Sequence, residues 1–143
     1  MSVHYQHDGI ATFPTTTDTI FRYMSAGGHQ HAAFKEHRLV GVTGDQVTVE
    51  AEIFNPDGST FSTTIEHQLN PPKSVETKMI GGAFDGATFT HTYTSVHGET
   101  RVDLEGEFPS MPGMTDADEL AMIDGFFTMV FDEDTDSLRT WAP

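Results

Sequence analysis

A chain of 143 residues with a formal net charge of −15 and no cysteine predicts one acidic domain over residues 1–143. The negative charge argues against nucleic acid and anionic membranes as partners, because both bind basic patches. The lack of cysteine excludes disulfides and thiolate metal ligands. The N-terminal residues form no signal-peptide pattern and no apolar run reaches about 18 residues, so we expect a cytoplasmic protein.

The first part of the chain is predicted to form one strand and two short helical pieces. The strand covers residues 3–12 and is stopped by Pro14. Residues 15–18 supply N-cap side chains for a helix that ends at two glycines, residues 27–28. A second helical piece is expected over residues 29–34.

The middle of the chain is predicted to form six strands that are joined by tight turns. We place them at residues 39–43, 46–54, 60–69, 74–80, 87–96 and 100–108. A long apolar helix from Thr115 to Arg139 closes the chain, with acids in its first turn that complement the helix dipole. These segregated runs predict an α+β domain in which helices pack on one face of an antiparallel sheet.

Several polar residues share the inward face of the predicted strands. Side chains alternate across a strand, so the apolar positions mark the face that points to the core. This alternation carries four polar residues inward: Thr63, His67, His91 and Tyr93. A buried polar group without a partner costs about 1–3 kcal/mol, so these residues must be hydrogen-bonded, hydrated or used for function. Both a structural and a functional role remain open for the two histidines.

One strand, the Phe13-Pro14 pair, the segment TDTIFRYM at residues 17–24, a run of strands and one long helix follow one another over nearly the whole chain. This order resembles the START/birch-pollen-allergen superfamily (SRPBCC), and within it the polyketide cyclase/dehydrase-like small proteins. The resemblance implies the helix-grip fold, a curved antiparallel sheet wrapped around the long C-terminal helix with an internal cavity. It also implies a hydrophobic or aromatic ligand. Some members only bind, whereas a minority are cyclases, dehydratases or metal-dependent hydrolases.

We therefore expect the binding of a small hydrophobic or aromatic molecule in an internal cavity. The cavity residues predicted from their positions are Thr63, Phe89, Met122, Phe126 and Met129. The acidic residues 132–134 and Asp136 are interpreted as a solvated face of the last helix. A homodimer, formed through an exposed strand edge or the apolar helix, is a further expectation.

Two enzymatic alternatives use the histidines. In the first, His29, His31 and His67 hold a divalent metal such as zinc, whose bound water acts in a hydrolase. An HxH pair can supply two ligands only where its segment is not a regular helix, and the last helix lacks the HxxxE pair of the metal-dependent hydrolases. In the second, a polyketide cyclase or dehydratase uses His67 or His91 as general base and Tyr93 as hydrogen-bond donor, with no cofactor.

Overall fold

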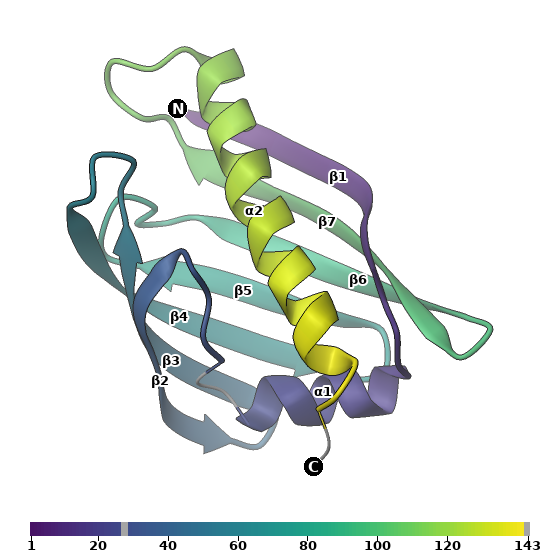
Figure 1. The fold of residues 1–143 in the computed structure, drawn as a ribbon. Coiled ribbons are helices and arrows are strands. Elements are labelled where there is room, and N and C mark those ends of the chain that lie inside the picture. The colour runs from purple at the N-terminus through teal and green to yellow at the C-terminus, as the bar shows by residue number, and fades with distance from the viewer. Residues whose placement is uncertain (27–28, 142–143) are drawn as a thin grey trace.

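The computed structural model describes residues 1–26 and 29–141, which form two helices and one antiparallel sheet (Figure 1). The strands are β1 (Ser2–Phe13), β2 (Phe34–Thr43), β3 (Gln46–Phe54), β4 (Thr60–Asn70), β5 (Ser74–Ile80), β6 (Thr88–Val96) and β7 (Glu99–Pro109). The helices are α1 (Thr17–Ala26) and α2 (Asp116–Leu138). The predicted α+β architecture is confirmed.

The sheet order is β1-β7-β6-β5-β4-β3-β2, and every neighbouring pair is antiparallel. Strands β2 to β7 follow one another as a meander because tight turns join them. The first strand pairs with the last, so β1 and β2 become the two edges of the sheet. Helix α1 connects these edges, while α2 crosses one face of the sheet diagonally (Figure 1). Neither helix within the described residues is long and apolar enough to cross a membrane.

Helix α2 begins and ends where the sequence predicts. The Thr115 side chain accepts a hydrogen bond of 3.1 Å from the backbone nitrogen of Asp118, which makes Thr115 the N-cap residue. Arg139 is the C-cap residue. Ile123, Phe127 and Phe131 recur at helical spacing and are buried against the sheet.

The expected second helical piece at residues 29–34 is wrong. Residues 29–31 have no regular structure, a turn follows, and Phe34 already begins β2. The backbone nitrogen of Phe34 donates to the oxygen of His31 at 2.9 Å, and the nitrogen of Phe54 donates to the oxygen of Ala33 at 2.9 Å. Pairing with β3 therefore satisfies backbone groups that an isolated short helix would leave to water.

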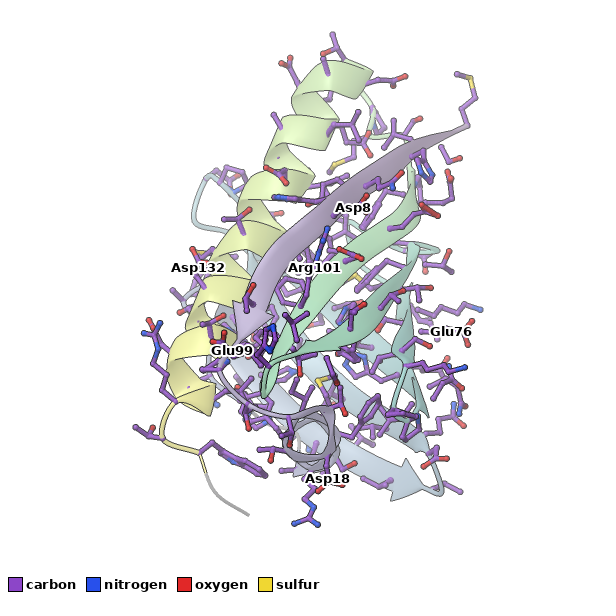
Figure 2. All side chains as sticks on the ribbon, turned by 90° about the vertical axis from the view of Figure 1, so that its right-hand side faces the viewer. Asp8, Asp18, Glu76, Glu99, Arg101 and Asp132 are labelled. Atoms are coloured by element: carbon purple, nitrogen blue, oxygen red, sulfur yellow. The ribbon has the colours of Figure 1, made fainter. Side chains whose placement is uncertain are left out.

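Acidic side chains cover the outside of the molecule. Asp8, Asp18, Glu76 and Asp132 all point away from the space between α2 and the sheet (Figure 2). Strand β2 is an edge that also exposes apolar side chains, namely Leu39, Val40 and Val42. Edge strands of this kind can pair with a second chain, so the homodimer stays a prediction.

Candidate ligand cavity

A cavity of about 90 Å³ lies between α2 and the inward face of the sheet. This volume holds several water molecules or one small organic molecule. Its walls are mainly apolar side chains, among them Val49, Ile53 and Ile65 from the sheet and Phe127 and Val130 from α2. Five of the eight histidines of the chain also line it: His29, His31, His37, His67 and His91. The polar groups therefore converge on an apolar space, as they do in small-molecule sites.

His91 lies on β6 with only 7 % of its surface exposed. Its ring stacks on Phe89, with ring centroids 5.6 Å apart. It also makes a T-shaped contact with Phe131, with ring centroids 5.2 Å apart. Nδ1 lies 3.4 Å from the hydroxyl of Tyr93. Nε2 is buried and has no hydrogen-bond partner among the residues that the structure describes. His91 thus lines the cavity and has one buried ring nitrogen without a partner in the described part of the chain.

His67 lies on β4 and reaches the same cavity from two strands away. Its Nδ1 lies 2.8 Å from the hydroxyl of Thr77, which is the residue opposite it on β5. Thr77 is itself buried, so this hydrogen bond satisfies a polar group on the inward face. His67 and His91 therefore both have a partner inside the sheet.

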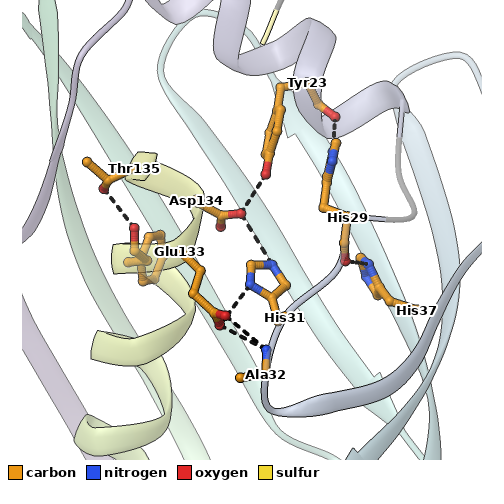
Figure 3. A network of polar contacts seen from close by, with 9 residues as sticks. Tyr23, His29, His31, Ala32, His37, Glu133, Asp134 and Thr135 are labelled. Carbon is orange, nitrogen blue, oxygen red and sulfur yellow. Dashed lines mark hydrogen bonds and ion pairs between the residues drawn. The ribbon is translucent and has the colours of Figure 1, made fainter. Parts of the chain in front are cut away.

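Glu133 and Asp134 of α2 join the segment before β2 to both helices (Figure 3). Oε1 of Glu133 lies 3.3 Å from Nδ1 of His31, and the backbone nitrogen of Ala32 donates to Oε2 of Glu133 at 2.9 Å. Oδ1 of Asp134 lies 3.3 Å from Nε2 of His31 and accepts a 2.8 Å hydrogen bond from the hydroxyl of Tyr23. These contacts form a polar network at one end of the cavity.

His29 and His37 extend this polar network through backbone oxygens (Figure 3). Nε2 of His29 donates to the backbone oxygen of Tyr23 at 2.6 Å, and the two rings stack with centroids 3.5 Å apart. Nδ1 of His37 donates to the backbone oxygen of His29 at 2.7 Å. The two imidazoles thus tie His29 to α1 and His37 of β2 to His29.

The histidines of the cavity have pKa values shifted in opposite directions. Burial lowers the pKa of His91 to about 4, although the charge of Asp134 opposes the shift. Burial, and then the neighbouring His91 and His37, lower the pKa of His67 to about 3. Burial alone would lower the pKa of His31, but the hydrogen bonds and charges of Asp134 and Glu133 raise it above its ordinary value. At neutral pH His67 and His91 are therefore neutral rings.

The neutral state of His91 predicts a specific pH dependence of stability. The unfolded chain takes up a proton near the ordinary value of 6.5, whereas folded His91 does so only near 4. The contribution of neutral His91 to the free energy of unfolding is therefore complete above pH 6.5, and it is lost as the pH falls toward 4. Between pH 7 and pH 5 we expect His91 to account for a loss on the order of 2 kcal/mol in the free energy of unfolding.

Chemical denaturation of the wild type and of His91→Phe at both pH values measures this loss. Phenylalanine keeps an aromatic ring but cannot titrate, so the variant should lose less stability on acidification than the wild type. His31, whose pKa is raised, contributes with the opposite sign in both proteins and cancels from the difference. Equal losses in the two proteins would contradict a neutral, buried His91.

Structure comparisons find the same fold in proteins of very different sequence. A START superfamily protein from Mycobacterium smegmatis superimposes with a TM-score of 0.73 at 9% identity, over 96% of this chain and 97% of that chain. The protein Ara h 8.0201 superimposes with a TM-score of 0.72 at 12% identity, over 99% and 100% of the two chains. The protein has the helix-grip fold. No protein-family model and no curated protein sequence matches this helix-grip chain.

A further structural neighbour of the helix-grip domain is the di-domain ARO/CYC StfQ from the steffimycin biosynthetic pathway. It superimposes with a TM-score of 0.66 at 13% identity and covers 94% of this chain. This chain spans only 51% of the StfQ chain, which fits one of its two domains. At these identities the likeness establishes the fold, and the function must be argued from the site itself.

The predicted metal ligands of the helix-grip domain do not come together. Within residues 1–26 and 29–141, no group of three or more histidine, aspartate or glutamate side chains could hold a metal ion. Both ring nitrogens of His31 face carboxylates, and Nε2 of His29 is engaged by a backbone oxygen. Nδ1 of His67 is hydrogen-bonded to Thr77. These residues as arranged do not fit a zinc site, and metal binding stays a prediction from the sequence.

Of the predicted cavity residues, Phe89 and Phe126 line the cavity, whereas Met122 and Met129 do not. A helix turns by about 100° per residue, which places Met129 almost opposite Phe127 on α2. Met129 is accordingly exposed. Met122 lies about 140° from Phe127 and packs, partly buried, against the core.

Thr63 and Tyr93 also point inward from their strands, but neither belongs to the cavity wall that the described residues form. Thr63 is buried but donates to the backbone oxygen of Ile80 at 3.2 Å. Tyr93 is buried behind His91 and packs edge-on against Phe21, with centroids 5.5 Å apart. Parity along a strand therefore predicts the face of a residue, but not whether the cavity reaches it.

Asp134, Glu133, Tyr23 and His37 were not among the site residues predicted from the sequence. The interpretation of the acidic run as a solvated face is wrong for Asp134, because its side chain lines the cavity. Its position seven residues after Phe127 was the available signal, since that spacing repeats on one helix face. His37 pairs opposite the inward-facing Ala51, but a register shift between Phe34 and Glu36 puts Phe34 and His37 on the same face although they are three residues apart. Strand parity counted from Phe34 would therefore have placed His37 on the outer face.

Proposed function

We propose that the protein binds one small apolar or aromatic molecule in the cavity between α2 and the sheet. The observation that carries the proposal is a mainly apolar cavity lined by His91, whose buried Nε2 has no partner within residues 1–26 and 29–141. Leaving such a nitrogen unpaired costs about 1–3 kcal/mol, a cost that a bound polar atom removes. The description of StfQ as an aromatase/cyclase of a biosynthetic pathway is consistent with an aromatic ligand for this fold.

Binding is better supported than acid–base catalysis. A general base works best when its pKa lies near the operating pH. The pKa values of His67 and His91 are about 3 and about 4, so both rings are weak bases at neutral pH. Tyr93 is buried and its pKa is raised by burial, so its hydroxyl stays protonated. The cavity therefore presents neutral hydrogen-bonding groups to a ligand.

Filling the cavity tests this function. Val130→Phe adds volume to the α2 wall of the cavity, whereas Met129→Phe places the same ring on the exposed side of that helix. Binding of α-methylstyrene, a small neutral aromatic probe, is followed by the NMR shifts of the methyl groups of Ile53, Ile65 and Met79, which line the cavity. We expect saturable shifts in the wild type and in Met129→Phe, and at least a tenfold weaker affinity in Val130→Phe.

The same spectra show where the probe binds if the proposal is wrong. Shifts confined to the exposed methyl groups of Leu39, Val40 and Val42 would indicate adsorption to the β2 edge. Unchanged affinity in Val130→Phe would also argue against the cavity. Native folding of both variants is checked by the dispersion of their amide signals.

A further inference from the structure

The orientation of the His91 ring is fixed by its neighbours. Phe89 stacks on one side at an interplanar angle of 18°, and Phe131 contacts the ring at 70°. With 93 % of its surface buried, the imidazole has little room to turn. Nδ1 points to the Tyr93 hydroxyl, and Nε2 is the ring nitrogen that has no partner among the described residues of this cavity-lining histidine.

The hydroxyl of Tyr93 selects the tautomer of this ring. Among the described residues, the hydrogen-bond partner of this hydroxyl is Nδ1 of His91, and the two atoms lie 3.4 Å apart. A buried hydroxyl needs an acceptor for its proton, so Tyr93 donates and Nδ1 accepts. The neutral imidazole then carries its own proton on Nε2. The opposite tautomer would leave two groups unsatisfied, the Tyr93 proton and the lone pair of Nε2, instead of one.

We infer that His91 is a specificity-determining residue whose Nε2–H anchors a hydrogen-bond acceptor, such as the carbonyl oxygen of a neutral aromatic ketone or aldehyde. This inference rests on the proposed function, because it names the class of molecule that the cavity takes. The acidic end of the cavity favours a neutral ligand over an anionic one. Asp134 lines it and Glu133 lies behind His31, so a carboxylate ligand would meet like charge. Tyr93 acts as the positioning residue.

A pair of probes of the same shape isolates this hydrogen bond. Acetophenone carries a carbonyl oxygen where α-methylstyrene carries a CH₂ group. Affinities of both probes for the wild type and for His91→Phe form a double-mutant cycle, in which the difference in hydrophobicity between the probes cancels. We expect the preference for acetophenone to fall by about threefold to tenfold in His91→Phe. Met129→Phe, which changes the exposed side of α2, is the control, and its preference should equal that of the wild type.

The tautomer is measured directly on the wild-type protein. Long-range ¹⁵N–¹H correlation of the imidazole rings distinguishes a protonated Nε2 from a protonated Nδ1. We expect a protonated Nε2 in the wild type and a mixture in Tyr93→Phe, with a reduced preference for acetophenone in that variant. A merely structural Tyr93 would change stability without changing the tautomer or the ratio of the two affinities.

Each outcome bears on one proposal. If both probes bind but their ratio is the same in the wild type and His91→Phe, or if Nδ1 carries the proton, the inference about His91 is wrong and the binding function stands. If neither probe enters the wild-type cavity, the proposed function itself fails. Because the wild-type tautomer needs no variant, the inference stays testable even where His91→Phe does not fold.

Discussion

Replacing Gly106 with alanine is expected to lower the free energy of unfolding by about 3 kcal/mol or more. Gly106 of β7 pairs with Phe89 of β6 and with Tyr5 of β1. A Cβ atom at this position would lie 2.5 Å from Cβ of Phe89 and 2.5 Å from the backbone oxygen of Thr88. Both distances are well inside van der Waals contact, and the obstacle is backbone, so β6 and β7 would have to separate.

The matched control is the same substitution on α2. Gly125 is exposed, and a Cβ built there meets no other atom of the described residues within 4 Å. Alanine is a better helix former than glycine, so Gly125→Ala should stabilise the protein by roughly 0.5–1 kcal/mol. Urea denaturation of both variants measures the two changes. A Gly106→Ala variant as stable as the wild type would mean that the strands are less closely paired than the structure has them.

Phe127→Ala is expected to cost about 3–5 kcal/mol of unfolding free energy. Phe127 is 4 % exposed and lies at the centre of the interface between α2 and the sheet. Its ring contacts Phe89 edge-on with centroids 4.9 Å apart, and stacks on Tyr5 at 5.8 Å. Removing it deletes these contacts and enlarges the cavity, because Tyr5, Phe89 and Phe108 lie on paired strands that hold their rings in place.

Phe54→Ala serves as the control, because Phe54 is 44 % exposed at the end of β3. It should change stability by about 0.5 kcal/mol or less. Thermal and urea denaturation compare the two variants. Since Phe127 also lines the cavity, the folded Phe127→Ala protein should accept a larger aromatic probe than the wild type does. Similar losses in both variants would argue against a core centred on Phe127.

Gly106 and Phe127 both lie where aromatic residues of α2 pack against β6 and β7. The same region holds Phe89 and His91, so the stability of the sheet and the orientation of the proposed ligand anchor have a common cause. A variant that loosens Phe89 should therefore also loosen the imidazole. Substitutions of Val130 and His91 remove neither ring of the Phe89–Phe127 contact.

The fold was largely predictable from local patterns. Alternation of apolar residues gave six of the seven strands nearly to their ends, since a strand with one buried face must repeat every second residue. Thr115 and the acids after it marked the start of α2 through capping chemistry. The start of β2 at Phe34 was missed because both faces of this edge strand are mostly exposed and a register shift between Phe34 and Glu36 interrupts the alternation.

The sequence by itself therefore determined the element order, the inward placement of His67 and His91, and the acidic exterior. Only the tertiary structure decided which of the inward residues reach the cavity, because that depends on how α2 crosses the sheet. The crossing brings Asp134 to His31 and Tyr23, residues more than 100 positions away in the chain, and leaves Met129 in solvent. It also leaves Nε2 of His91 without a partner among the described residues, which no local pattern can reveal, because the pairing of a polar atom depends on contacts from every side.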